Sequence, residues 1–342
     1  MASGEAALAY EVDGLELVET LTFPWQPWPA DASRQAAFLS ALELLHLIAG
    51  ISYYKAGLAT TIAVGDDRLD PALSGFLNEL YTRGLGEFAY VNQLDLSGLS
   101  LFQANTNAAP RSVDLDLPER ALVAMGGGKD SLVCLELLRG AGIEVQPVCV
   151  GGAALIGDTV RAAGLPLIRI GRRLAPQLAD LNEQGAWNGH VPVTAINSAV
   201  IVCAALLYGY RYVVFANESS ADEATLTTAQ GLEVNHQYSK SLAFERAFAA
   251  LIHRRVSPSL DYFSLLRPFG EAAIARRFAA LDRYHGVFSS CNRNFHLDGA
   301  RIKGRWCARC PKCRFTALAL APFLAPADLK AIQGGDLLDD KE

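Results

Sequence analysis

A glycine-rich segment of the sequence combines residue types that bind phosphate. It follows the apolar, strand-like run 121–125, precedes a helical pattern, and consists of Gly126, Gly127, Gly128, Lys129, Asp130 and Ser131. Glycines let backbone N–H groups turn toward one point, and a helix N-terminus adds the positive end of its dipole. Lys129 adds a charge and Ser131 a hydroxyl donor, while Asp130 can cap the helix or reach a magnesium ion. The segment predicts an anion site; the alternative is a strand–helix turn without a ligand.

The spacing of these residues differs from two common phosphate-binding motifs. Asp130 separates Gly-Lys from Ser, and no glycine stands five places before Gly128, so the segment is not a Walker A loop. Three adjacent glycines also differ from the spaced Gly-x-Gly-x-x-Gly of dinucleotide-binding folds. The segment therefore indicates a different class of phosphate loop.

A second polar segment follows the strand-like run 212–216. It contains Asn217, Glu218 and Asp222, whose oxygen atoms are hard ligands of the kind magnesium prefers. Strand ends of a parallel sheet meet at one edge, where the glycine-rich segment is also expected. We interpret these three residues as part of a nucleotide and Mg²⁺ site; the alternative is a polar, capped loop that enters the next helix.

Two further polar segments carry side chains that can transfer protons. His190 lies in a Gly- and Pro-rich stretch before an apolar helix that Thr194 or Asn197 can cap. His236 and Lys240 lie in a second polar stretch that opens a long helix, whose free N–H groups could receive a carboxylate. All three are candidate acid–base groups or substrate clamps, and ordinary surface polarity is the alternative for each.

A cysteine cluster near the C-terminus has the spacing of a metal site. Cys307, Cys310 and Cys313 are each separated by two residues, and Cys291 is the nearby thiol able to complete a four-sulfur zinc site. The prediction is structural Zn²⁺; buried cysteines without metal, or one catalytic thiol among the four, are the alternatives. The remaining cysteines lie within apolar runs typical of a core: Cys134, Cys149 and Cys203.

The elements that would position these residues alternate between strand and helix after residue 120. Apolar runs predict strands over 121–125, 145–150, 167–170, 212–216 and 262–266. Helical patterns lie between them over 131–139, 158–163, 196–207, 239–254 and 271–284. Such alternation predicts an α/β fold with a doubly wound parallel sheet, whose ligand site lies at the carboxyl ends of the strands.

The chain is expected to divide into two domains. Residues 1–117, which include a helix candidate over 42–51, form a smaller N-terminal, substrate-binding domain, and the Asn-, Ala- and Pro-rich stretch 103–118 is the connection. Residues 118–325 form the nucleotide-binding domain, with the cysteine clip at 291–313. Residues 326–342 are expected to be a frayed tail.

Composition places the chain among globular proteins. Of its 342 residues 51% are hydrophobic and 19% charged, which excludes a disordered chain, and no uninterrupted apolar stretch approaches the length of a membrane helix. The N-terminus lacks the features of a secretion signal, and three of the seven cysteines crowd together, so we expect a soluble cytoplasmic protein with reduced thiols. A formal charge of −6 argues against a nucleic-acid partner.

The glycine-rich segment resembles the Ser-Gly-Gly-x-Asp-Ser motif of the PP-loop ATP pyrophosphatases, with Gly126 in place of the serine. The resemblance implies an adenine nucleotide alpha hydrolase-like fold in which the loop holds the pyrophosphate end of ATP. A substrate oxygen then attacks the α-phosphate and releases pyrophosphate. It also implies that the polar segment with Asn217, Glu218 and Asp222 lies near the nucleotide.

Four other stretches are similar to the UDP-N-acetylmuramoyl-L-alanyl-L-glutamate epimerases of bacterial cell-wall synthesis: residues 50–56, 189–198, 215–221 and 234–241. This resemblance extends from about residue 10 to 325. It implies a UDP-linked muramoyl dipeptide as substrate and ATP-dependent inversion of its terminal L-glutamate through an acyl-adenylate. The cations available for such a substrate are Lys55 and the pairs Arg172-Arg173, Arg254-Arg255 and Arg276-Arg277. The oligomeric state does not follow from the sequence.

Three other functions are compatible with part of this pattern. A tRNA-modifying sulfur transferase would need a basic RNA-binding face, whereas the chain is acidic. By resemblance, a 7-cyano-7-deazaguanine synthase would lack the N-terminal domain. A non-enzymatic nucleotide-binding protein would keep the phosphate loop without the polar segments after the later strands. The epimerase remains the preferred interpretation.

Overall fold

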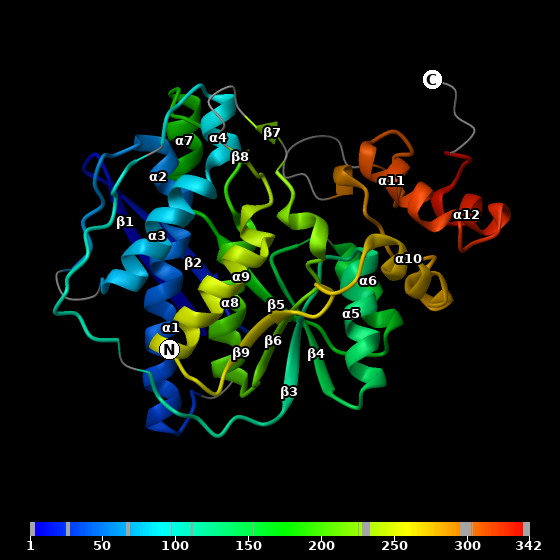
Figure 1. The fold of residues 1–342 in the computed structure, drawn as a ribbon, viewed down its shortest axis with the longest axis horizontal. Helices are drawn as coiled ribbons and strands as arrows, with labels where there is room; N and C mark the ends of the chain where they lie inside the picture. The colour runs from blue at the N-terminus through cyan, green and yellow to red at the C-terminus, as the bar shows by residue number, and fades with distance from the viewer. Residues whose placement is uncertain are drawn as a thin grey trace. The chain divides into compact units, whose positions relative to one another are not determined.

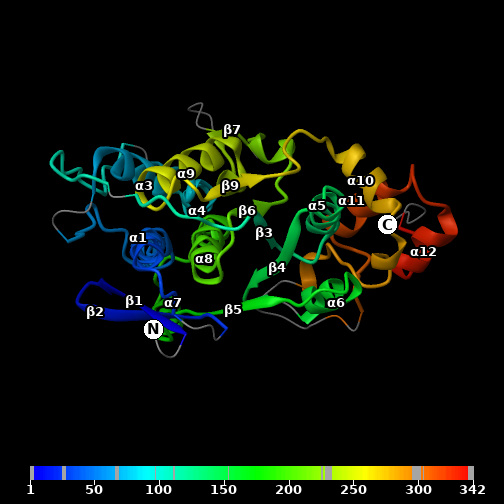
Figure 2. The same ribbon diagram turned by 90° about the horizontal axis from the view of Figure 1, so that it is seen from below.

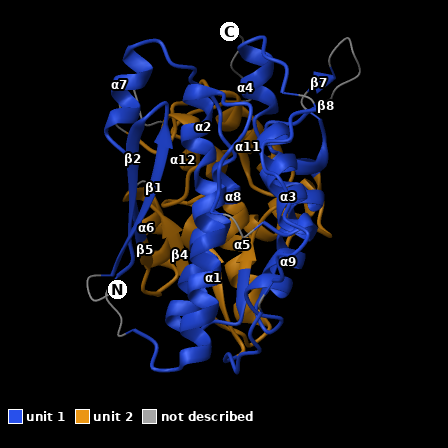
Figure 3. Ribbon diagram, turned by 90° about the vertical axis from the view of Figure 1, so that its left-hand side faces the viewer, with its two compact units in different colours: residues 1–118, 170–213, 220–263 blue, residues 119–169, 214–219, 264–342 orange. Residues whose placement is uncertain are grey.

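The computed structural model is an α/β fold of helices and short strands (Figure 1). It describes residues 4–24, 28–65, 69–96, 98–110, 112–152, 154–224, 226–227, 233–294, 302 and 304–337. The chain forms two compact units (Figure 3). Unit 1 contains residues 1–118, 170–213 and 220–263, and unit 2 contains residues 119–169, 214–219 and 264–342. The predicted division of functions between two consecutive domains stays a prediction, because each compact unit is built from several segments of the chain.

Unit 1 begins with a β-hairpin that the sequence analysis did not predict. Strands β1 (Glu5–Val12) and β2 (Leu15–Thr22) pair antiparallel, from Glu5 opposite Thr22 to Val12 opposite Leu15. Asp13 and Gly14 connect them with φ of 50° and 81°. Two consecutive positive φ values are the signature of the type I′ turn, whose twist matches that of the flanking strands. Strand β2 also pairs antiparallel with β5 (Ile168–Arg173), so the predicted parallel sheet is confirmed only in part: the sheet is mixed.

Helix α1 (Ala32–Ala49) forms the core of unit 1. Asp31 caps it by accepting hydrogen bonds from the backbone N–H groups of Ser33 (3.0 Å) and Arg34 (3.2 Å). The helix packs against α8 (Val193–Tyr208) and lies between the β1–β2 hairpin and helices α3 and α9 (Figure 2). By length and composition the segment Ala32–Gly57 could cross a membrane, but 61% of its most apolar window is buried inside the protein, as in a core helix.

Shorter elements complete unit 1. The helices are α2 (Ile51–Gly57), α3 (Pro71–Arg83), α4 (Gly86–Val91), α7 (Gln177–Glu183) and α9 (Leu242–Arg255), with the 3₁₀ turn Tyr238–Lys240 before α9. Strands β7 (Leu226–Thr227) and β8 (Glu233–Val234) form a small antiparallel pair. Helices α3, α4 and α7 were not predicted from the sequence.

Unit 2 contains a parallel pair of strands. Strand β3 (Arg120–Ala124) pairs parallel with β4 (Glu144–Val150), with Arg120 opposite Glu144 and Ala124 opposite Val148. Helices α5 (Lys129–Gly140) and α6 (Ala154–Ala162) lie on the same side of these strands (Figure 2). Strand β4 lies between β5 and β3, and β6 (Tyr212–Phe215) between β3 and β9 (Asp261–Ser264). All five predicted strands after residue 120 are therefore present, with small shifts at their ends.

The C-terminal part of unit 2 is helical. Helix α10 (Glu271–Ala279) packs against α5, and α11 (Pro311–Leu320) packs against α10 and α12 (Pro326–Gln333). The prediction of a frayed tail was wrong for the residues of α12. Leu329 is buried, and Gln333 donates a hydrogen bond from Nε2 to the carbonyl of Cys313 (3.2 Å). The last five residues, 338–342, lie outside the described residues.

Candidate functional site

The predicted phosphate loop connects β3 to α5 in unit 2. The N–H of Met125 donates to the carbonyl of Val148 (2.8 Å), which extends the parallel pairing to the start of the loop. Gly127 has φ of 79°, a conformation that only glycine adopts without strain. Gly128 then begins α5 with extended backbone, and no side chain among the described residues caps this helix. The loop thus has the geometry of an anion site, with backbone N–H groups at a helix N-terminus.

Lys129 lies between two carboxylates in this loop. Its side chain is 4% exposed, and its Nζ lies 2.6 Å from Oδ1 of Asp130 and 2.6 Å from Oε1 of Glu271. Burial alone would lower the pKa of Lys129, but the two carboxylates outweigh burial and raise it, so Lys129 is charged. Glu271, the first residue of α10, was not among the predicted site residues.

Ser131 and a neighbouring loop complete the local structure. Ser131 is buried and donates from Oγ to the carbonyl of Gly128 (3.1 Å). The N–H of Ser289 donates to the carbonyl of Gly127 (3.2 Å). A Cβ added to Gly128 would lie 3.3 Å from Oγ of Ser290, so this glycine permits the close approach of the 289–290 segment. The hydroxyl of Ser131 must turn away from its carbonyl partner to reach a phosphate.

The polar segment after β6 is held by its neighbours. Asn217 donates from Nδ2 to Oγ of Ser264 (3.0 Å), and Arg267 donates to the carbonyl of Glu218 (2.8 Å). Asp222 accepts a hydrogen bond at Oδ1 from the backbone N–H of Leu242 (2.6 Å), in the first turn of α9. These contacts show how the segment is fixed, and its predicted role beside a nucleotide stays a prediction.

The three candidate proton-transfer residues come together in unit 1. The rings of His190 and His236 are 6.3 Å apart between centroids, and Nδ1 of His190 lies 3.8 Å from Oε2 of Glu87 in α4. Burial, the largest effect, lowers the pKa of His190; Glu87 raises it, and the charges of His236 and Lys240 lower it. The net effect favours the neutral imidazole, the form that accepts a proton. Lys240 donates from Nζ to Oε1 of Gln237 (3.3 Å).

The helices next to these loops begin differently from the predictions. Helix α8 begins at Val193 without a side-chain capping bond among the described residues, so the predicted capping by Thr194 or Asn197 was wrong. In the first turn of α9, Ser241 accepts from the N–H of Phe244 (3.2 Å) and Asp222 from that of Leu242 (2.6 Å). These two N–H groups are therefore not available for a substrate carboxylate.

The predicted cations differ in their surroundings. Arg172 donates to both carboxylate oxygens of the buried Glu19, at 2.6 and 3.0 Å. Arg255 pairs with Asp70, a fully buried residue that also caps α3. Lys55 in α2 is buried and donates to Oδ1 of Asn188, in the loop that carries His190. Lys55 therefore contacts the loop that carries His190.

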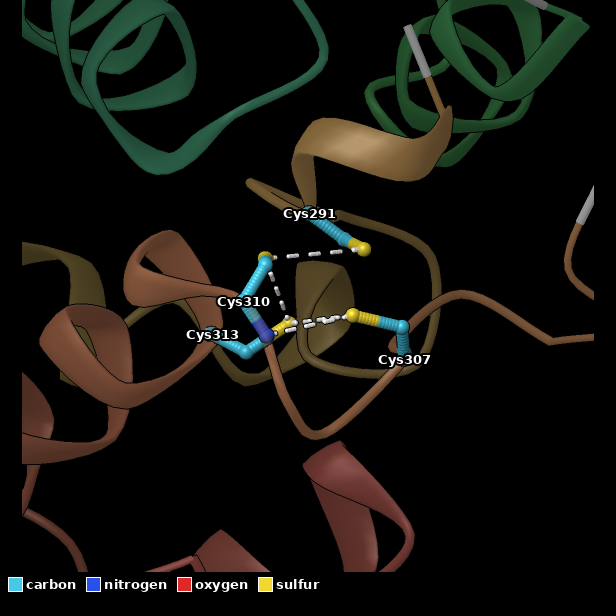
Figure 4. Close-up of side chains that lie close together, drawn as sticks. All are labelled: Cys291, Cys307, Cys310 and Cys313. Atoms are coloured by element: carbon cyan, nitrogen blue, oxygen red, sulfur yellow. Dashed lines mark hydrogen bonds between the residues drawn. The ribbon is translucent and has the colours of Figure 1, made fainter. Parts of the chain in front are cut away.

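The four predicted metal ligands converge in unit 2 (Figure 4). The Sγ atoms of Cys291, Cys307, Cys310 and Cys313 all lie within 4.8 Å of one another, with separations of 3.4 Å for 310–313, 3.8 Å for 307–313 and 4.0 Å for 291–310. A tetrahedral site with Zn–S bonds of about 2.3 Å has S···S edges of roughly 3.8 Å. The donor set and its spacing therefore fit a structural zinc ion.

The backbone around Cys307 favours its thiolate form. Burial would raise the pKa of this thiol, but the N–H groups of Arg309 and Cys310 and the neighbouring thiols bring it down to about 6. The N–H of Cys310 lies 3.4 Å from Sγ of Cys307. Burial raises the pKa of Cys291 and Cys313. A cation among the four sulfurs would stabilise the thiolate form of all of them.

We expect about one equivalent of zinc per chain, because four converging thiolates close a tetrahedral site. Changing Cys310→Ser should remove the zinc and lower the melting temperature, since three thiolates bind the ion far more weakly. Metal analysis and thermal denaturation measure both effects. Cys149→Ala, which changes a buried thiol outside the cluster, should keep the zinc. A folded, metal-free chain in which all four thiols react freely with a thiol reagent would contradict the prediction.

Comparison with known proteins identifies the family. The model of the MurL N-terminal domain matches residues 1–265, and that of the MurL C-terminal domain matches residues 287–342. A protein of Xanthomonas oryzae pv. oryzae is 50% identical over 339 residues, which cover 99% of this chain and 75% of that protein. Proteins of Micromonospora sp. and Salinispora tropica are each 40% identical over 346 residues, covering 100% and 99% of this chain and 76% and 75% of their own lengths. All three are named UDP-N-acetyl-alpha-D-muramoyl-L-alanyl-L-glutamate epimerase, and this chain therefore belongs to the MurL family of epimerases.

Proposed function

We propose that this protein inverts the terminal L-glutamate of UDP-N-acetylmuramoyl-L-alanyl-L-glutamate to D-glutamate in an ATP-dependent reaction through an acyl-adenylate. Membership of an epimerase family supports the inversion and the substrate. The observation that carries the ATP-dependent part is the loop before α5, where Gly127 and Gly128 bring backbone N–H groups to a helix N-terminus beside the charged Lys129. A PP-loop ATP pyrophosphatase fold for unit 2 is part of the same proposal.

Activation of the carboxylate explains why an epimerase would consume ATP. The α-proton of a free glutamate carboxylate is hard to remove, because a carbanion would form beside a full negative charge. When a carboxylate oxygen attacks the α-phosphorus of ATP, pyrophosphate leaves and the carboxylate becomes a neutral acyl group. Loss of the α-proton then gives an enolate whose charge lies on the acyl oxygen. Return of a proton to the opposite face gives the D-centre, and water attacks the acyl carbon and releases AMP.

The described residues suit the separate parts of this reaction. The loop Gly126–Ser131 would hold the ATP phosphates, with Asn217, Glu218 and Asp222 as candidates for the nucleotide's Mg²⁺. The proton-transfer group would be one or two of His190, His236 and Lys240, which lie together in unit 1. Zinc, if held by the four cysteines, would be structural, because a four-sulfur site is closed to substrate.

The reaction in heavy water tests this function as a whole. If the α-proton is exchanged through a protein base, deuterium should appear at Cα of the D-glutamyl product. AMP and pyrophosphate should form with it, and ADP should not. Nuclear magnetic resonance of the product and chromatography of the nucleotides measure these outcomes, with ATP omitted as the control. Inversion without ATP, or a ligated or thiolated product, would contradict the proposal.

A further inference from the structure

Unit 1 contains a cavity that none of the predicted catalytic, nucleotide-binding or metal-binding residues line. It has a volume of about 600 Å³, which lies within the range of about 300–1,000 Å³ typical of small-molecule sites. Its walls come from β1, α1, α2, α3 and the segment 59–65, with Arg255 at the end of α9. The reacting glutamate requires a proton-transfer group, and His190, His236 and Lys240 are absent from the lining. The cavity therefore suits a part of a ligand that does not react.

Aromatic rings form much of the wall. Tyr10 stacks on Tyr53 with centroids 4.7 Å apart, and Tyr81 contacts Tyr54 and Phe102 edge to face at 5.4 and 4.9 Å. Tyr10 is the partly exposed ring of this set, since the other four are buried. Such walls bind flat, neutral rings by stacking and apolar contact.

One polar atom of the wall is buried without a partner. The hydroxyl of Tyr10 donates to the carbonyl of His46 (2.9 Å), that of Tyr81 to the carbonyl of Leu47 (2.7 Å), and that of Tyr53 to Glu19 (3.2 Å). Among the described residues, the hydroxyl of Tyr54 has no hydrogen-bond partner, and the residue is 7% exposed. A buried donor without a partner is costly. The hydroxyl is itself buried, so the Tyr54 side chain must shift to reach a ligand, and a ligand that then accepts from it would remove this cost.

The charges of the lining disfavour an anionic group. Arg255 is the one arginine or lysine among the described lining residues, and it pairs with the buried carboxylate of Asp70. The acidic lining residues Glu11, Asp13 and Glu43 are exposed. Carboxylates accept hydrogen bonds from ribose hydroxyls, as acidic residues do in nucleotide-binding folds, but they repel phosphates. The lining thus fits a nucleoside, whose phosphates would lie outside the cavity.

Helix α2 joins this cavity to the loop that carries His190. Tyr54 lines the cavity, and the next residue, Lys55, donates to Oδ1 of Asn188 two positions before His190. From this arrangement we infer that the cavity is the subsite for the uridine end of the substrate, an inference that rests on the proposed function. A subsite on α2 would bind the non-reacting end while the other end of the same molecule approaches the proton-transfer residues.

Binding of uridine to the full chain tests the inference without ATP or turnover. Calorimetry should show saturable uridine binding, and UMP and UDP should bind no more than about tenfold more tightly, because the lining offers no unpaired cation for phosphate. Tyr54→Phe, which removes the buried hydroxyl alone, should weaken binding roughly threefold to tenfold. Ala63→Trp, at an exposed position of the lining, should weaken it at least tenfold by filling the cavity. Ala36→Trp, at an exposed position of α1 outside the lining, is the matched control and should bind normally.

Turnover separates failure of this inference from failure of the proposed function. With the UDP-linked dipeptide, Ala63→Trp should raise KM at least tenfold and leave kcat within about twofold, because uniform binding is lost. With a muramoyl dipeptide that lacks uridine, the variant and the unaltered protein should have the same KM. Equal uridine binding by both proteins, no uridine binding at millimolar concentration, or equally tight adenosine binding would overturn the inference, even if ATP-dependent epimerisation is observed. Uridine binding that Ala63→Trp weakens would uphold the subsite even if epimerisation fails.

Discussion

The double variant Lys129→Ala, Ser131→Ala is expected to lose AMP formation, with a fall in rate of at least about a hundredfold, the effect of removing a single preorganised donor. Lys129 supplies a charge and Ser131 a hydroxyl at the start of α5, where the ATP phosphates would bind. Both side chains are buried in the loop, so solvent cannot replace them as donors. Substrate-dependent release of AMP, measured by chromatography, tests the prediction.

The controls for this variant follow from the contacts of Lys129. Removing the lysine alone leaves Asp130 and Glu271 without the ammonium that each contacts at 2.6 Å. The variant Lys129→Met, Glu271→Gln removes the charge together with one partner, and it should keep a melting temperature closer to that of the unaltered chain. It should still lose AMP formation, because the phosphate loop lacks its cation. Unchanged turnover in either double variant would refute a phosphate-binding role for this loop.

Local sequence patterns predicted those elements that are held by contacts between residues close together in the sequence. Strands β3 and β4 and helix α5 follow from apolar runs and from the glycines between them. The cysteine spacing indicated a cluster, and the four Sγ atoms do lie within 4.8 Å of one another. In both cases the residues that form the structure are also neighbours in the sequence, apart from Cys291.

The β1–β2 hairpin was missed although its signal is present. Asp13-Gly14 is a strong turn pair, and the flanking residues alternate between buried and exposed. The charged Glu19 interrupts the apolar pattern, because it occupies a buried position of β2 where Arg172 neutralises it. That partner is distant in the sequence, so the local pattern alone makes β2 look like a polar segment.

Long-range pairing also limited the prediction of the candidate site. Glu271 contacts Lys129 at 2.6 Å, yet nothing in the sequence around either residue indicates the pair. The cavity in unit 1 is built from β1, three helices, the segment 59–65 and Arg255, and no short motif encodes it. Sequence spacing identified His190, His236 and Lys240 as separate candidates, whereas their proximity depends on how the two loops fold.

The second large effect is expected on proton exchange at Cα, when one of the candidate proton-transfer residues is replaced. If one of the three is the base that removes the α-proton, replacing it should stop deuterium exchange at Cα and still allow a first turnover to release AMP. The variants are His190→Asn, His236→Asn and Lys240→Met, each of which removes the titrating group and keeps a side chain of similar size. Single-turnover measurement of AMP, combined with the deuterium content of recovered substrate, separates a base from a residue that binds ATP. AMP release and exchange that fall together in all three variants would contradict a base among them.

The dependence of the rate on pH distinguishes His190 from the other two. Burial already lowers the pKa of His190, and Glu87 opposes this by favouring the protonated ring. Glu87→Gln removes the opposing charge, so the pKa should fall further. A base acts in its neutral form, which would then persist to lower pH, and the acidic limb of the profile of kcat/KM should move to lower pH. Glu144→Gln in β4 is the control, because Glu144 is exposed, pairs with Arg120 and is not among the charges that act on His190. An acidic limb that moves to higher pH in Glu87→Gln would exclude His190 as the group whose titration sets that limb. So would a limb that stays in place in Glu87→Gln while His190→Asn abolishes exchange.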